Sequence, residues 1–273
     1  MISKKGYSEY SLKLETITKV VHSTCVDLFE KDNIIEPKRY LFNNILNNTN
    51  NLNTLSYLLM EAKDRRHFAT SIVLILRNLL TQNIQCIHLM AKADEDDEKF
   101  LNNIEVVNYD HVQRLESNYK SFLGHHYYRH KHKKIHEEIR RLNEKYKKPD
   151  TKISPKEFTT IKAIKDLLEM HKNDEGFYNI IGRMADSWIL FSKYEHAGEF
   201  SFKLTMRAFK DEEIPKLFES YIHAIDFNLV VLIANLGSFP TDIINDQFIS
   251  ELTKLRLELQ EIGIKYIEES EKK

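Results

Sequence analysis

Apolar side chains recur at steps of three and four residues along almost the whole chain, and no stretch of useful length alternates between apolar and polar residues. The first spacing places apolar side chains on one face of an α-helix, whereas alternation would be expected of a half-buried strand. The pattern therefore predicts an all-α, multi-helix bundle. The expected helices span residues 8–31, 37–47, 51–64, 66–92, 95–105, 108–147, 155–172, 175–196, 211–237 and 243–270.

Local start and stop signals divide these segments. Pro155 suits the first turn of a helix, where its missing N–H is not needed, and Ser154 is expected to cap that helix. The asparagine-rich run at 48–53 predicts a break between two helices, and residues 147–155 predict a linker. The expected organisation is N-terminal helices over 1–50 that pack on the core, a main bundle over 51–240 and an amphipathic C-terminal helix over 241–273.

Composition agrees with long helices joined by few turns, since the 273 residues include only 7 glycines and 5 prolines. Lys and Arg (40) balance Asp and Glu (41), so a basic surface for nucleic acid must be local. The N-terminus has no apolar signal segment, and Cys25 and Cys86 show neither metal spacing nor a disulfide framework. We therefore expect a cytoplasmic protein without a cofactor.

The two most apolar stretches are residues 71–90 and 221–239. Arg77 interrupts the first, and polar residues including His223 and Asp226 interrupt the second. Charged side chains are costly inside a bilayer, so both stretches are expected to be buried core helices rather than membrane spans.

Arg77 is the only formally charged residue over 67–91, and it shares a helix face with apolar residues. A buried guanidinium is costly unless it is paired, because it loses its hydration. On the helix expected at 175–196, Ser192 and His196 share one face and lie one turn apart. We expect these three polar side chains to meet.

Two interpretations of this group remain open. In the first, Arg77 donates to helix carbonyls or to a carboxylate such as Asp186 or Glu195, and His196 is equally structural, as in a non-enzymatic scaffold or protein-interaction module. In the second, Arg77 binds a phosphate and His196 transfers a proton. The 2′-hydroxyl of RNA would then supply the nucleophile, so that no metal ion is needed.

The segments LRNLLT, with Arg77, and WILFSKYEH, with Ser192 and His196, resemble an uncharacterised bacterial helical family. That family has an arginine in a long apolar helix and, far downstream, an aromatic-x-x-aromatic-Ser-x-x-x-His motif at a helix end. The resemblance covers residues 55–240, approximately. Members often carry a glutamate four residues after the arginine, where this chain has Thr81.

More loosely, the chain is similar to the HEPN superfamily, helical bundles of toxins and antiphage systems. Many members are metal-independent ribonucleases whose arginine and histidine act in a composite dimer site. The resemblance implies that Arg77 contacts phosphate, that His196 is the acid and base, and that Ser192 and Tyr194 orient the site. It implies an RNA-binding protein or endoribonuclease of a bacterial defence or toxin system, with RNA and a second copy or a cognate partner as binding partners.

Residues 124–148 hold the strongest local concentration of basic side chains, with Tyr127 and Tyr128 among them. Basic side chains contact phosphates and aromatic rings stack on bases, although a solvated helix face has the same pattern. The nearest literal match to the HEPN arginine and histidine spacing, RHKHKKIH, also lies here. The expected RNA-binding residues are Arg129, Lys131, Lys133, Lys134, His136, Arg140 and Arg141.

Two histidine pairs with a spacing of four, His126 with His130 and His132 with His136, could each bind one ion on a helix face. The pairs lie on different faces, however, and no HExxH motif accompanies them. We therefore expect no physiological metal site.

Overall fold

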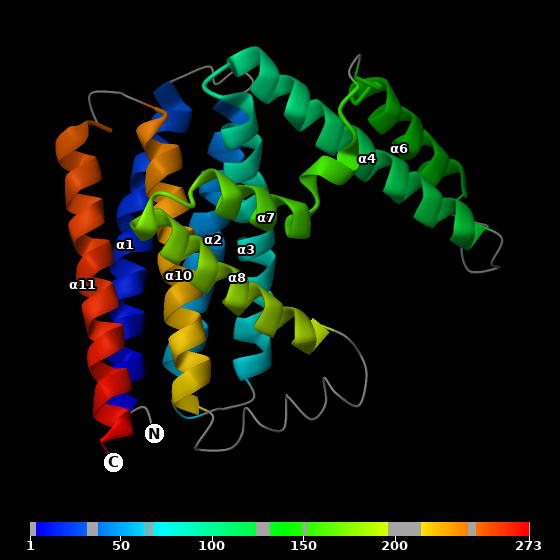
Figure 1. The fold of residues 1–273 in the computed structure, drawn as a ribbon. Helices are drawn as coiled ribbons and strands as arrows, with labels where there is room; N and C mark the ends of the chain where they lie inside the picture. The colour runs from blue at the N-terminus through cyan, green and yellow to red at the C-terminus, as the bar shows by residue number, and fades with distance from the viewer. Residues whose placement is uncertain are drawn as a thin grey trace. The chain divides into compact units, whose positions relative to one another are not determined.

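The computed structural model describes residues 4–31, 38–62, 64, 68–123, 132–149, 152–195, 214–239 and 244–272. Throughout these ranges the regular secondary structure is helical, without strands (Figure 1). The prediction of an all-α, multi-helix protein is confirmed. The helices are α1 (Lys4–Lys31), α2 (Lys38–Ala62), α3 (Phe68–Ala93), α4 (Asp97–Leu123), α6 (His132–Lys145), the 3₁₀ helix η1 (Pro155–Phe158), α7 (Thr160–Met170), α8 (Glu175–Glu195), α10 (Ile214–Gly237) and α11 (Asp246–Glu271).

The chain forms two compact units. The larger unit combines Met1–Cys86 with Leu167–Lys273, and the smaller unit is Ile87–Asp166. Helix α3 therefore contributes its first part to one unit and its last part to the other. The two units are defined by the contacts between residues. The division into segments 1–50, 51–240 and 241–273 stays a prediction.

In the larger unit, α1 packs against α2 and α11, while α10 packs against α2, α8 and α11. Figure 1 shows α1, α10 and α11 alongside one another. Lys13 pairs with Glu258, and the Tyr266 hydroxyl donates to Glu9, so α1 and α11 run antiparallel. The apolar stripe of the C-terminal helix is thus used for packing within this unit, where Leu252 and Leu259 are buried.

Two glycines allow these helices to approach closely. A Cβ atom at Gly263 of α11 would lie 2.6 Å from Ile222 Cδ1 of α10, and one at Gly6 of α1 would lie 2.7 Å from the Tyr266 ring. Both distances are far below ordinary van der Waals contact. The close packing of α11 therefore depends on residues without side chains at both positions.

The predicted break at the asparagine-rich run is wrong, because α2 continues through it from Lys38 to Ala62. Asparagine favours turns when its side chain bonds to nearby backbone. Here Asn48 is buried and exchanges two side-chain hydrogen bonds of 2.7 Å with Asn83 on α3. Asn83 also donates to Asn228 of α10 at 2.5 Å. Tertiary partners thus stabilise asparagine inside a helix.

Helix α10 is long and apolar enough to cross a membrane by length and composition, and it is the one such helix among the described residues. Within the structure, 61% of its most apolar window is buried in the protein. Its buried residues include Ile225, Leu229 and Leu232. Core burial accounts for this hydropathy, as predicted for residues 221–239.

In the smaller unit, α4 packs against α6 and η1. The predicted break near residues 106–107 is wrong, because α4 continues from Asp97 to Leu123. Gln113 of α4 donates to Asn143 of α6 at 3.2 Å, and Asn143 donates to Glu116 at 3.1 Å. These bonds fix α6 on α4.

The start signal at Ser154 and Pro155 is confirmed, since the Ser154 side chain accepts a hydrogen bond from the Lys156 N–H. It begins η1 rather than a long α-helix. The chain is extended again at Thr159, and α7 follows from Thr160.

Candidate functional site

Helices α3 and α8 bring together the polar side chains that the sequence placed on their inward faces. Arg77 Nε donates to Ser192 Oγ at 3.3 Å. One turn away, the Trp188 indole N–H donates to Thr81 Oγ1 at 3.0 Å. Arg77 contacts Ser192, and Thr81, which is later in α3, contacts Trp188, which is earlier in α8. The two helices therefore run antiparallel. The predicted meeting of Arg77 with Ser192 is confirmed.

The hydroxyl groups of Ser192 and Thr81 each accept a hydrogen bond from a side chain of the opposite helix. Ser192 Oγ donates its own proton to the Trp188 carbonyl at 2.7 Å, and Thr81 Oγ1 donates to the Arg77 carbonyl at 3.0 Å. Their lone pairs remain for the guanidinium and the indole. Thr81, four residues after Arg77, thus has a hydrogen-bonding role of its own.

The four side chains of this group, Arg77, Thr81, Trp188 and Ser192, are half-buried rather than sealed in the core. Tyr194 is also half-buried on α8. The Arg77–Ser192 contact places a fixed cation at a surface that solvent reaches in part. His196, the predicted acid and base, lies outside the described residues, as does the side chain of Glu195.

Helix α6 presents most of the predicted RNA-binding side chains to solvent. Lys133, Lys134 and His136 are exposed. Arg141 pairs with Glu138 at 2.9 Å and Arg140 with Glu144 at 3.7 Å, both within the helix. These acids offset part of the positive charge, and the two lysines are the more available phosphate contacts. Arg129 and Lys131 lie outside the described residues.

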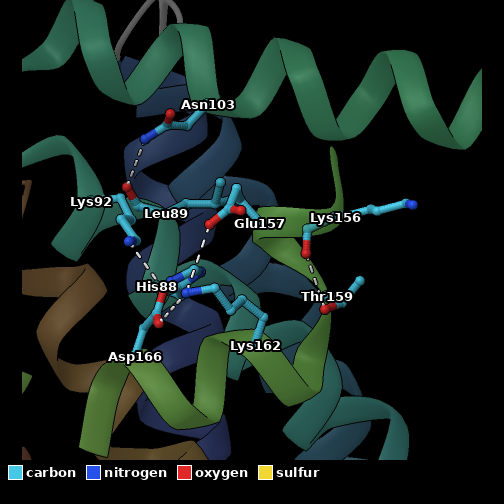
Figure 2. Close-up of polar contacts among 9 residues, drawn as sticks. All are labelled: His88, Leu89, Lys92, Asn103, Lys156, Glu157, Thr159, Lys162 and Asp166. Atoms are coloured by element: carbon cyan, nitrogen blue, oxygen red, sulfur yellow. Dashed lines mark hydrogen bonds and ion pairs between the residues drawn. The ribbon is translucent and has the colours of Figure 1, made fainter. Parts of the chain in front are cut away.

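A second polar group, which sequence reasoning missed, lies where α7 packs on the end of α3 (Figure 2). Asp166 of α7 accepts from His88 Nε2 and from Lys92 Nζ, both at 3.0 Å, and from Lys162 Nζ at 2.5 Å. Lys162 also lies 3.7 Å from Glu157 of η1. Figure 2 shows the three nitrogen-bearing side chains converging on one carboxylate.

The electrostatics of this group follow from burial and from that convergence. Burial alone would raise the pKa of Asp166, but hydrogen bonds from Lys162, Lys92 and His88 outweigh it and hold this pKa well below its usual range. Burial lowers the pKa of His88, and the hydrogen bond to Asp166 opposes that change only in part. His88 is therefore a neutral imidazole whose Nε2–H donates to Asp166.

The other ring nitrogen, Nδ1 of His88, is buried and has no hydrogen-bond partner among the described side chains and backbone. A carboxylate that orients a neutral imidazole is also the arrangement of a general base. His88 is fully buried, however, so no substrate reaches it here. The group is an anchor that joins α7 to α3.

One sequence signal could have pointed to this anchor. His88 and Lys92, like Lys162 and Asp166, are separated by four residues and so lie on one helix face. Each pair is visible in the sequence, but many such pairs are solvated. Only the packing of α7 on α3 joins them.

Neither cysteine supplies a nucleophile. Burial raises the pKa of the Cys25 thiol to about 11 and that of Cys86 to about 12, the latter in spite of a hydrogen bond to Asn235. Since the thiolate is the reactive form, both are inert core residues at neutral pH.

No protein-family model matches the chain, and no curated protein or solved structure matches it. The resemblances to the helical family and to HEPN proteins therefore rest on the motif residues alone. The coarser conclusion, an all-helical protein, rests on the structure itself.

The lowered pKa of His88 predicts that the protein loses stability as the pH falls. The usual pKa of an imidazole is about 6.5, so below this pH His88 binds a proton in the unfolded chain but not yet in the folded protein. Protonation of His88 therefore favours unfolding. His223, whose pKa is lowered by burial and by Arg183, contributes with the same sign. The lowered pKa of Asp166 acts separately, at more acidic pH.

Urea unfolding between pH 7.5 and 5.0 measures this dependence. In His88→Gln the amide can still donate to Asp166 but does not titrate, so the loss of stability over this range should be smaller than in the wild type. His22→Gln, at an exposed position on α1, should retain the wild-type slope. Equal slopes for His88→Gln and the wild type would contradict the prediction.

Proposed function

We propose that the protein binds RNA and cleaves it without a metal ion, as a cytoplasmic effector of a bacterial defence or toxin system. The observation that carries the proposal is the Arg77–Ser192 contact. It holds a guanidinium on a partly solvated surface, beside a serine that precedes His196 by four positions in the sequence. A fixed cation of this kind suits the charge that develops on a phosphodiester during cleavage.

In the proposed reaction the RNA 2′-hydroxyl attacks the adjacent phosphorus, and the bond from phosphorus to the 5′-oxygen breaks. The products are a 2′,3′-cyclic phosphate and a 5′-hydroxyl. Arg77 stabilises the phosphate oxygens, while Ser192 and Tyr194 orient the site. His196 accepts the 2′-hydroxyl proton as the base and donates a proton to the departing 5′-oxygen as the acid. Helix α6 holds the RNA through Lys133 and its neighbours. A homodimer or a cognate partner would complete the site, as the HEPN resemblance implies.

A second function is favoured by a different observation. The Trp188–Thr81 and Arg77–Ser192 hydrogen bonds each give a polar side chain of α3 a partner on α8. Together they join the two helices. Such a network is what a non-enzymatic scaffold or protein-interaction module needs in order to keep two helices in register. In that case Arg77 has a structural role only.

Cleavage of fluorescently labelled single-stranded RNA in EDTA tests the first function. The wild type should release fragments that end in a cyclic phosphate. Arg77→Ala and His196→Ala should each lower the rate at least about 100-fold, the usual effect of removing a transition-state donor or a general acid or base. Both variants should unfold cooperatively, near the wild-type melting temperature.

Matched controls lie close to these positions. Lys193→Ala removes an exposed cation next to Ser192, and His22→Ala removes an exposed imidazole on α1, so both should cleave at the wild-type rate. A wild-type protein that neither binds nor cleaves RNA, together with an Arg77→Ala variant of low stability, would overturn the ribonuclease proposal in favour of the scaffold.

A further inference from the structure

Two histidines on the exposed face of α6 bring their Nε2 atoms close together. The Nε2 atoms of His132 and His136 lie 3.2 Å apart. Their ring centroids are 4.2 Å apart, with the rings tilted by 44°. Both side chains are exposed, so an ion from solution can reach them without a conformational change.

This separation matches the bite of a chelate. Zinc–imidazole bonds are about 2.0–2.1 Å long, and two such bonds at an angle of about 100° separate the nitrogens by about 3.2 Å. The sequence pattern predicted no metal site here, but on the strength of this separation we propose that His132 and His136 form a bidentate site for a divalent transition-metal ion. The ion binds both Nε2 atoms, and water fills its remaining coordination positions.

The same separation also suits a hydrogen bond between the rings in the metal-free protein, in which one Nε2–H donates to the other nitrogen. Metal binding requires a lone pair on both Nε2 atoms. The neutral donor ring meets this requirement by moving its proton to Nδ1, a tautomer change that leaves the charge of the ring unaltered. Both nitrogens can then present a lone pair to the same ion.

Nearby charged side chains both favour and oppose the binding of a cation by the two histidines. Hydrogen bonds from Lys120 and Asn143 hold the pKa of Glu116, on α4, below its usual range, so this carboxylate near the pair is ionised at neutral pH. That carboxylate favours a bound cation. Lys133 and Lys134 are exposed and oppose it, although salt at physiological strength screens such charges beyond about 8 Å.

The pair supplies two protein ligands. Among the described residues, no group of three or more His, Cys, Asp or Glu side chains is assembled for a metal ion. An open two-histidine site is expected to follow the general order of affinity for divalent ions, with Cu²⁺ above Ni²⁺ and Zn²⁺.

Isothermal titration of the full chain, freed of any affinity tag and stripped with EDTA, tests the proposal with Ni²⁺, Zn²⁺ and Cu²⁺ salts alone. The wild type should bind with the order of affinity given above. His132→Ala and His136→Ala should each weaken binding at least about tenfold, because one metal ligand is lost. Binding should also weaken from pH 7.5 to 5.5, since protons compete for imidazole.

His111→Ala, an exposed histidine on α4, should keep the wild-type affinity. Unchanged affinity after the double change His132→Ala/His136→Ala would overturn the proposal, because the metal would then be bound elsewhere. The absence of binding in the wild type would overturn it as well. Neither result bears on RNA cleavage, which is measured in EDTA.

Discussion

Replacing Asn83 by alanine is expected to lower the free energy of unfolding by about 2–4 kcal/mol. Asn83 is fully buried and donates to the side-chain oxygens of Asn48 and Asn228, which lie on two other helices. Its own oxygen accepts from Asn48. The substitution leaves two buried amides without these bonds and opens a small cavity, and both effects act in the same direction.

The larger unit has a convenient probe for this measurement, because Trp188 is the only tryptophan in the chain. Urea unfolding followed by its fluorescence should show a lower midpoint in Asn83→Ala. Asn50→Ala removes an exposed asparagine of the same run on α2 and should change stability by less than about 0.5 kcal/mol. Equal midpoints for Asn83→Ala and Asn50→Ala would show that the buried amide network contributes nothing.

Asp166→Ala is expected to destabilise the smaller unit by about 2–4 kcal/mol, the range for a buried polar group that loses its partner. Asp166 is the common acceptor of His88, Lys92 and Lys162. The two lysines can turn to water, but the His88 ring is fully buried and its Nε2–H would be left without this acceptor. The loss therefore falls mainly on the imidazole.

Hydrogen exchange measured by mass spectrometry localises this effect. Amides of residues 160–166 and 87–93 should exchange faster in Asp166→Ala, because the substitution releases α7 from α3. Glu105→Ala removes an exposed carboxylate of α4 in the same unit and should leave these amides protected as in the wild type. Wild-type protection in Asp166→Ala would show that apolar contacts alone, such as those of the buried Phe158, hold α7 in place.

Helical periodicity carried most of the fold prediction, because the side chains that recur every three to four residues must share one face and find a partner surface. The same reasoning put Arg77 and Ser192 on inward faces, and the two side chains are in contact. The predicted break at the asparagine run of α2 was wrong, because the local turn preference of asparagine is weaker than its hydrogen bonds to partners that lie far away in sequence.

The polar anchor around Asp166 is a second feature that the sequence pattern did not predict. His88 and Asp166 are 78 residues apart, and their sequence neighbourhoods contain nothing that pairs them. A solvated i, i+4 pair and a buried anchor have the same sequence pattern. Their difference lies in desolvation, which depends on what packs over them.

The sequence by itself determined that the chain is all-helical, where most helices lie and which faces they bury, because these follow from local periodicity. Tertiary structure decided what the buried polar groups do. It paired Asn48 with Asn83, Thr81 with Trp188 and His88 with Asp166, each across two helices. A hydrogen bond depends on a few tenths of an ångström between atoms remote in sequence, and only the packed helices set that distance.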